Sequence, residues 1–483
     1  MQHPRRTVHH RSCIALALLT LAGGAGAATT QVLEATSALG FETVKLPQGE
    51  HMGLVGGAYL FDIGGDFRLG PAVYGAATGR VGGLFVGGAE LRRQWALSRS
   101  IRLAAGFYAG GGGGASAPVG GGLMLRPSLA LLGDVMPGMQ AGLSWSQVRF
   151  PSGDIRSQQL GLLLQWRSQF KHYTDVKPGD AVGAGAGLGL DEGALTFMQY
   201  RFNDAGGRHI GLVGARAQYR GDGPLRFGVE AVAAAQGNAA GYMEVLGTVS
   251  AGTDILPDWR VGVRAAAGLG GGGAVPTAGG VLGKLTGTAS WQVTPGWRVG
   301  ADLGVVRALH GGLQARQVGA WLSTDLEPAY GSPGHAVRTD WTAVLQHHAG
   351  IARTDGSARG LDTIGLKLDR YLGDNLYASG QAHSAYAGGA GAYSVGLLGL
   401  GYAMPLSPGW RIGVEALAGA AGGGGVKTGG GAIGQGVAWA GWTPERSAGE
   451  WRLGLGARRP LRAGTSTGLV ELAWSRSFGV SGR

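Results

Sequence analysis

Side chains alternate with a two-residue period over long stretches of this chain. Residues 297–305 and 410–418 each have one apolar face and one face of glycine and charged residues. In the first stretch the apolar face consists of Trp297, Val299, Ala301, Leu303 and Val305. Because successive side chains of a strand point to opposite faces, this pattern predicts β-strands that are apolar on one side only.

The segment 257–325 shows how such strands follow one another. Turn residues at 257–258, 276–279, 294–296 and 310–312 separate predicted strands at 259–271, 281–293, 297–309 and 313–325. Each predicted strand is therefore 13 residues long. Strands of globular proteins average about 5–6 residues, whereas a tilted strand needs about 9–11 residues to cross a bilayer. The lengths favour an antiparallel membrane barrel, with apolar residues toward lipid, over a soluble sandwich.

Internal repeats organise the chain into three parts. Residues 51–56 (HMGLVG) recur as residues 209–214 (HIGLVG), an offset of 158, and a weaker copy lies at 363–366. Each copy continues to a glycine run, at 110–114, 270–273 and 422–425. We therefore predict three repeats, at approximately 28–189, 190–337 and 338–483.

The N-terminus is predicted to be a secretory signal peptide over residues 1–27. Three arginines precede the apolar stretch 14–22, and Ala25-Gly26-Ala27 fits a small-residue cleavage site. The single cysteine, Cys13, lies before the apolar stretch. A mature chain cut after Ala27 would contain no thiol, so disulfides and cysteine chemistry are excluded. No other stretch approaches the roughly 20 apolar residues of a membrane helix.

Tryptophan follows short turns at four places, and arginine follows each tryptophan. The tryptophans are Trp259, Trp297, Trp410 and Trp451. At the end of a strand on the apolar face, tryptophan is typical of the aromatic girdle at a membrane interface. The polar face then points into the lumen, and its candidate charged residues are Arg102, Arg260, Arg264, Arg298, Arg411, Arg452, Asp302 and Glu415. These residues would either attract anions or pair across strands and stabilise the wall.

The last segment resembles the closing strand of bacterial outer-membrane β-barrel proteins. Val470, Leu472, Trp474 and Phe478 share one face, which Arg476 interrupts. The resemblance implies a porin-like location in the bacterial outer membrane and contact with its lipid. It also implies recognition by the barrel assembly machinery, for which Trp474 and Phe478 are the candidate signal. Five residues follow Phe478, where the family usually ends on an aromatic residue.

The strand count leaves two architectures open. About eight strands per repeat predict either one barrel of 20–24 strands or three tandem eight-stranded barrels. An eight-stranded barrel must fill its interior with side chains. Most inward positions here are glycine or alanine, which favours the single wide barrel. The inter-repeat segments 170–193 and 326–340 keep the tandem arrangement open.

No motif of a catalytic site, metal site or phosphate loop is present. His347 and His348 are adjacent, so they would point to opposite faces of a strand. We therefore expect no enzyme, no cofactor, no metal and no nucleic-acid partner. The leading hypothesis is an outer-membrane pore or export channel with an Arg-rich lumen, with an anionic solute or a polysaccharide as its candidate cargo. The alternatives are a non-conducting structural or surface-interaction barrel and a secreted glycine-rich β-protein.

Overall fold

The chain folds entirely into β-structure. The computed structural model describes residues 29–483 apart from 205, 221–223, 329–331, 446, 448 and 463. Within these residues there are 25 strands and no helix long and apolar enough to cross a membrane. The predicted signal peptide, residues 1–27, and its Cys13 lie outside the described residues.

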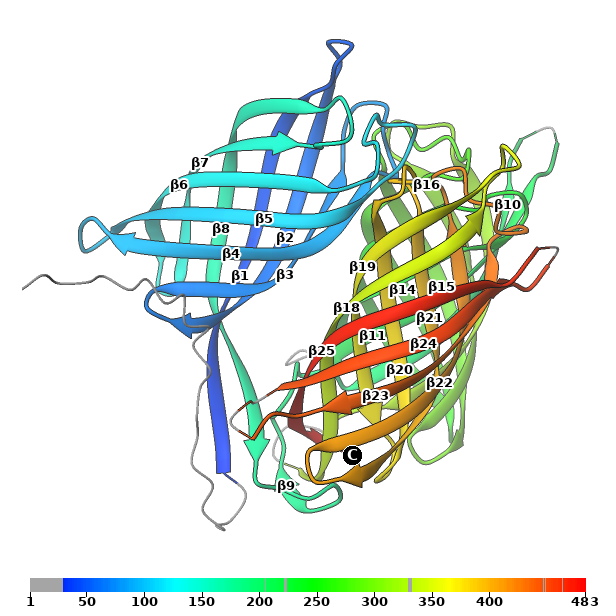
Figure 1. Cartoon of the computed structure of the whole chain (residues 1–483). Coiled ribbons are helices and arrows are strands. Elements are labelled where there is room, and N and C mark those ends of the chain that lie inside the picture. The colour runs from blue at the N-terminus through cyan, green and yellow to red at the C-terminus, as the bar shows by residue number, and fades with distance from the viewer. Residues whose placement is uncertain are drawn as a thin grey trace, which may run out of the picture.

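Twenty-four of the strands form three eight-stranded antiparallel barrels, each closed by pairing of its first and last strands (Figure 1). The pairing of Tyr173 with Gly479 joins barrels 1 and 3 at one position. Barrel 1 contains β1 (Thr29–Lys45), β2 (His51–Gly64), β3 (Phe67–Ala76), β4 (Phe85–Ala96), β5 (Ile101–Gly113), β6 (Met124–Met136), β7 (Met139–Arg149) and β8 (Arg156–Thr174). Each strand pairs with the next, and β1 pairs with β8 to close the circuit.

Barrels 2 and 3 close in the same way. Barrel 2 contains β10 (Glu192–Phe202), β11 (His209–Arg220), β12 (Leu225–Gln236), β13 (Met243–Leu256), β14 (Trp259–Gly271), β15 (Val281–Thr294), β16 (Trp297–Ala308) and β17 (Gln314–Asp325), closed by β10–β17 pairing. Barrel 3 contains β18 (Pro333–Ala352), β19 (Ala358–Tyr371), β20 (Leu376–Ala387), β21 (Ser394–Ser407), β22 (Trp410–Gly422), β23 (Ala432–Trp442), β24 (Gly449–Pro460) and β25 (Thr467–Gly482), closed by β18–β25 pairing. The short β9 (Ala181–Gly183) lies between barrels 1 and 2 in sequence and pairs with β18.

The prediction of an all-β membrane-type barrel protein with up to 24 barrel strands is confirmed, but the preferred single wide barrel is wrong. The alternative of three tandem eight-stranded barrels is the observed architecture. Glycine and alanine at inward positions suggested an interior too empty for a narrow barrel. In the structure, long charged and aromatic side chains such as Lys367, Arg452 and Trp321 reach across and fill that space.

Each barrel has two different ends, which we call the turn end and the loop end. The turn end carries two-residue turns such as 137–138, 257–258 and 295–296. At residues 257–258 the turn requires a positive φ, which Asp258 adopts at 67°. The loop end carries the longer connections, including 114–123, 272–280 and 423–431. In bacterial outer-membrane barrels the short turns face the periplasm and the longer loops face outward.

The outer surface of the barrels is apolar. Leu160, Leu303 and Leu455 are 64–70% exposed on the outward face of their strands. Trp259, Trp297, Trp410 and Trp451 are 44–46% exposed, and all four lie at the turn end of barrels 2 and 3. An apolar exterior with tryptophans gathered at one level is what a membrane-spanning barrel presents to lipid. Barrel 1 has Ile101 and Met139 at the positions equivalent to Trp259 and Trp297.

The three barrels meet at their loop ends through glycine backbone. A Cβ on Gly271 of barrel 2 would lie 2.4 Å from the carbonyl oxygen of Gly82 in barrel 1. A Cβ on Gly422 of barrel 3 would lie 2.0 Å from the amide nitrogen of Gly241 in barrel 2. A Cβ on Gly113 of barrel 1 would lie 2.8 Å from the carbonyl oxygen of Gly391 in barrel 3. The three contacts use equivalent positions, so the barrels form a closed head-to-tail ring.

Hydrogen bonds reinforce this glycine junction. The amide of Gly82 donates to Ala278 at 2.6 Å, and the amide of Gly391 donates to Gly120 at 3.0 Å. No side chain larger than hydrogen fits at the closest approaches, which explains why the glycine runs recur at the same place in each repeat.

Aromatic packing joins barrels 1 and 3 at the turn end. Strands β1 and β8 extend beyond barrel 1 as a two-stranded ribbon toward β9 (Figure 1). Phe170 of this ribbon packs against Phe478 of β25, with ring centroids 5.0 Å apart, and Trp341 of β18 lies beside both. Phe478, one of the two predicted assembly-signal residues, is therefore buried between barrels, whereas Trp474 is exposed on the outer face.

Candidate functional site: the barrel interiors

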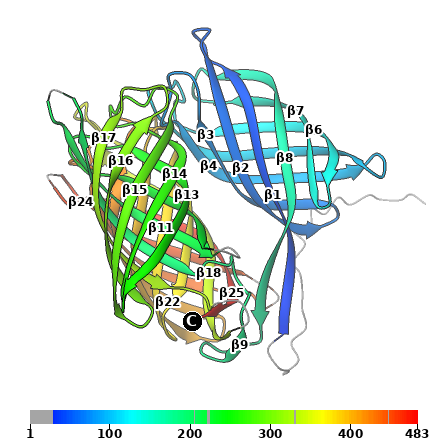
Figure 2. The ribbon, with the colours of Figure 1, turned by 180° about the vertical axis from the view of Figure 1, so that it is seen from behind.

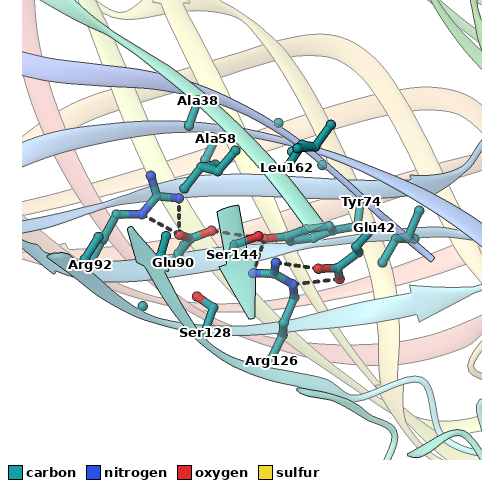
Figure 3. Close-up of a pocket in the computed structure, with 18 residues that line it drawn as sticks. Ala38, Glu42, Ala58, Tyr74, Glu90, Arg92, Arg126, Ser128, Ser144 and Leu162 are labelled. Carbon is teal, nitrogen blue, oxygen red and sulfur yellow. Dashed lines mark hydrogen bonds and ion pairs between the residues drawn. The ribbon is translucent and has the colours of Figure 1, made fainter. Parts of the chain in front are cut away.

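The interior of barrel 1 contains a chain of ion pairs and hydrogen bonds (Figure 3). The Arg126 guanidinium donates from Nε to Glu42 Oε1 at 2.9 Å and from Nη2 to Glu42 Oε2 at 2.7 Å. Tyr74 donates its hydroxyl proton to Glu90 at 3.1 Å and accepts from Arg126 at 3.2 Å. Arg92 pairs with Glu90 from the next inward position on the same strand. Every charge in this network has an opposite partner, as burial requires.

A small cavity lies beside this network. Its volume is about 30 Å³, which is room for about two water molecules. Small residues at inward positions border the cavity. They include Ala58 and Ser128 (Figure 3), together with Ala104 and Gly106. Barrel 1 is thus polar and incompletely filled at its middle.

Barrel 2 holds two connected charge clusters. Lys284 contacts Glu230 at 2.7 Å and Glu244 at 2.5 Å. The hydroxyls of Tyr200 and Tyr242 each donate to Glu244 at 2.7 Å. In the second cluster Asp302 accepts from Arg264 Nη1 at 2.8 Å and from Trp321 Nε1 at 2.9 Å. Arg216 lies between the two clusters, 3.7 Å from both Glu230 and Asp302.

Barrel 3 has the same kind of interior, built from different strand positions. Lys367 is fully buried and donates to Glu415 at 2.9 Å and to Glu471 at 3.0 Å. Tyr377 donates to Glu415 at 2.9 Å. A second cluster surrounds Arg452, which donates to Asp340 at 2.7 Å and to Asp369 at 3.1 Å and also pairs with Glu450.

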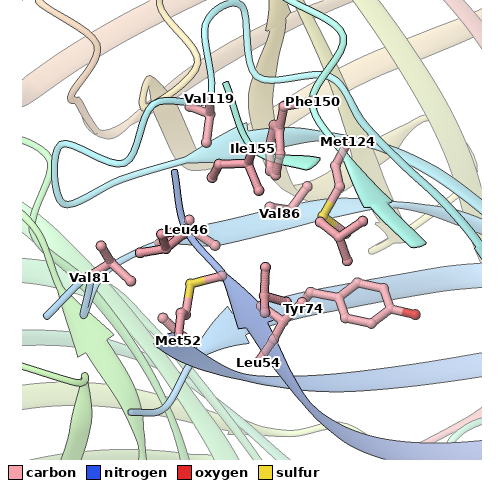
Figure 4. Packing of buried hydrophobic residues seen from close by; sticks show 14 of the residues in the cluster. Leu46, Met52, Leu54, Tyr74, Val81, Val86, Val119, Met124, Phe150 and Ile155 are labelled. Carbon is pink, nitrogen blue, oxygen red and sulfur yellow. The ribbon is translucent and has the colours of Figure 1, made fainter. Parts of the chain in front are cut away.

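An apolar cluster closes each barrel at its loop end. In barrel 1, Leu46, Val81, Val119, Phe150 and Ile155 come from strand ends and loops and pack together above the polar network (Figure 4). Barrels 2 and 3 have corresponding clusters, which include Tyr242 and Val275 in one and Tyr393 and Val426 in the other. The loops therefore fold over the barrel mouths and cover them with buried hydrophobic side chains.

The predicted lumen residues lie on the inward side of their strands, and most have partners there. Arg264 and Arg452 are buried with Asp302 and Asp340. Arg411 lies 3.0 Å from Glu450, Arg298 donates to Gln292 at 2.7 Å, and Arg260 donates to the Gly252 carbonyl at 3.0 Å. Asp302 and Glu415 accept from Arg264 and Lys367. The arrangement is that of cross-strand pairs inside narrow barrels; a wide Arg-lined lumen is not formed.

Several interior residues were missed by sequence analysis. The central pairs of Glu42 with Arg126 and of Lys284 with Glu230 join strands far apart in sequence. A signal was available, because isolated charges occur at inward positions in the middle of predicted strands. The pairing partners required knowledge of which strands face each other across a barrel. As expected from their adjacency, His347 is exposed and His348 is buried, and no group of metal-ligating side chains occurs within the described residues.

The closed barrels and their apolar, tryptophan-edged exterior define the class of this protein. It is a bacterial outer-membrane-type β-barrel protein, with three barrels in one chain.

Comparisons with known proteins add little to this assignment. No protein-family model and no curated protein matches the chain. Among solved structures, OccK11 (OpdR) of Pseudomonas aeruginosa is 11% identical, with a TM-score of 0.20, over 93% of this chain and 96% of that one. The FrpB iron transporter of Neisseria meningitidis is 10% identical, with a TM-score of 0.26, over 93% of this chain and 82% of that one. These values are too low to assign a family or a substrate.

Proposed function

We propose that this protein is a sealed three-barrel component of the outer membrane with a structural or surface-interaction role. The observation that carries the proposal is the apolar cluster at the loop end of each barrel, above an interior whose charges are paired. A path for ions would need water-filled space through the apolar cluster and through the paired charges below it. Outer-membrane lipid and the assembly machinery are the partners that such a protein requires.

Single-channel recording in a planar bilayer tests the proposal. The refolded mature chain should migrate with a heat-dependent gel shift, insert, and show no steady conductance, since a dry apolar layer opposes ion passage. Large, steady, anion-preferring steps would contradict it and would support the pore or export-channel hypothesis, with an anionic solute or polysaccharide as cargo.

A narrow pore through barrel 1 is the second candidate, because the cavity of about 30 Å³ beside Arg126 could hold the first waters of an aqueous path. Under this hypothesis, small conductance steps should appear and should grow when Phe150 and Val119, which cover the mouth, are both replaced by serine. The matched control replaces Tyr242 and Val275 at the mouth of barrel 2, where conductance should not change.

A further inference from the structure

The outer face of barrel 2 carries a row of basic side chains at the loop end. Arg307 on β16, Arg316 on β17 and Arg201 on β10 are all exposed and lie on the outward side of three neighbouring strands. His209 on β11, also exposed, continues the row. Strands β16 and β17 lie at the edge of the molecule away from barrel 1 (Figure 2).

The strand register brings these cations close together. Arg201 is directly opposite Arg316 in the β10–β17 pair, and it is directly opposite His209 in the β10–β11 pair. Side chains directly opposite each other have Cβ atoms about 4.5–5.5 Å apart, and like charges at such positions are destabilising. Among the described residues no carboxylate forms an ion pair with Arg201, Arg307 or Arg316. Such a row is stable when an anion lies between the guanidinium groups.

The position of the row along the barrel axis indicates the source of that anion. The next outward residues toward the turn end are Val305 on β16, Val318 on β17 and the polar Gln199 on β10. Phe197 follows Gln199 on β10, and Val305, Val318 and Phe197 are all at least 47% exposed on the lipid-facing surface. The arginines thus lie where the apolar surface ends at the loop end, which is the level of lipid headgroups. Arginine binds phosphate oxygens through two parallel N–H groups, so phosphate suits this row in charge and geometry.

The repeats provide an internal comparison. Barrel 1 places Arg149 directly opposite Arg156 on the equivalent strands β7 and β8. In barrel 3 the exposed Arg359 and His347 pair with Asp355 at 3.0 Å and Asp362 at 2.6 Å. Arg459 on β24 is also exposed, but its partner in the β23–β24 pair is Gly434 and not a second arginine. Barrels 1 and 2 therefore place two arginines directly opposite each other at the loop-end rim, and the described residues of barrel 3 contain no such pair there.

We propose that Arg201, Arg307 and Arg316 form a binding site for the phosphate groups of anionic lipid in the outer leaflet. The site rests on the proposed membrane placement of the barrels. It adds a specific lipid contact on the outer face of barrel 2, with a counterpart on barrel 1 at Arg149 and Arg156.

Lipid binding by the full mature chain tests the site. The chain is refolded in neutral detergent with a chelator present, and bound phosphatidylglycerol and phosphatidylcholine are counted by native mass spectrometry during titration. Wild type should prefer phosphatidylglycerol. The triple variant R201S/R307S/R316S should lose about a hundredfold in that affinity, since each basic residue at an anionic surface contributes about fivefold.

The matched control is R80S/R359S/R462S, which removes three exposed arginines that already have partners in Glu50, Asp355 and Gln236. The control should bind phosphatidylglycerol as wild type does. Equal affinity in wild type and the first triple variant would overturn the proposal. So would displacement of the lipid by an equal concentration of inorganic phosphate, because the site would then be one for free anions.

Two further measurements separate lipid binding at the arginines from correct folding and from membrane placement of the barrels. Heat-dependent gel mobility reports folding of each variant; if the triple variant does not fold, salt titration of wild type replaces it. Rising salt should release phosphatidylglycerol, and salt-insensitive retention would overturn the proposal. Failure of wild type to insert into phosphatidylcholine vesicles would refute the membrane placement, whereas insertion without preference for anionic lipid would refute only the arginine site.

Discussion

Barrels 1 and 3 have the same number of strands and the same connectivity, yet their interiors are packed differently. Barrel 1 surrounds the Glu42–Arg126 pair with alanine, glycine and serine and leaves a cavity of about 30 Å³. Barrel 3 surrounds Lys367 with Glu415, Glu471 and Tyr377, and no solvent reaches the lysine. The comparison shows that strand number fixes the width of a narrow barrel, while side-chain size decides how much water remains inside it.

Removing the central cation should affect the two barrels unequally, and this is the largest expected effect. Lys367→Met leaves the buried carboxylates of Glu415 and Glu471 without their shared cation, so we expect a loss of about 3–5 kcal/mol. Arg126→Met should cost clearly less, because water in the adjoining cavity can hydrate Glu42. The temperature of the heat-dependent gel shift measures both. Equal shifts would refute the link between cavity and tolerance.

The glycine junction should be more sensitive than glycines that face lipid. In Gly422→Leu the new side chain meets the backbone of Gly241, and overpacking of this kind costs about 1–3 kcal/mol. Barrels 2 and 3 should then separate at the loop end. Spin labels at Leu285→Cys and Leu455→Cys should report a longer, broader distance. Gly396→Leu, with open space around its Cβ, is the control and should leave the distance unchanged.

A larger interior side chain should be tolerated only where the barrel contains a cavity. Ala104→Val points into the cavity of barrel 1, and we expect a gain of up to about 1 kcal/mol. Ala266→Val in barrel 2 points into packed side chains beside Lys284 and should be destabilising. Denaturant titration of both variants checks the contrast. A loss of stability in Ala104→Val would show that hydration of the cavity contributes more to stability than filling its volume does.

The smallest expected effect is a pH dependence of the linker that joins barrels 2 and 3 at the turn end. The glycine junction at the loop end should not share it. Glu327 lies in the linker between barrels 2 and 3, and desolvation raises its pKa to about 7 although Arg370 opposes the shift. A raised pKa stabilises the folded linker below the ordinary carboxyl pKa, and that stability is lost as pH rises through 7.

Hydrogen exchange of Gly187 and Gly189, which lie against Glu327, should therefore be slower at pH 5.5 than at pH 8, after correction for intrinsic rates. Glu327→Gln should remove the difference. Persistence of the pH effect in this variant would assign it to another group.

Sequence analysis predicted the strands better than it predicted their closure. The strands predicted at 259–271, 281–293, 297–309 and 313–325 agree with β14 to β17 within one residue at each boundary. Periodicity, turn residues and strand length are local properties, so a single sequence contains them. The two-residue alternation also placed the candidate arginines on the inward face of their strands. It did not predict which residues they would contact there.

The sequence by itself therefore determined an all-β chain with an apolar outer face, and it predicted three repeats of about eight strands each, 20–24 in all. Only the tertiary structure decided that each repeat closes on itself, because the choice between β1–β8 pairing and a continuous wall depends on hydrogen bonds between residues more than 100 positions apart. It also decided that the inward charges neutralise one another and that the glycine runs bring three barrels into contact. These outcomes depend on which side chains and backbones meet in space, and the two-residue period of a strand does not encode that.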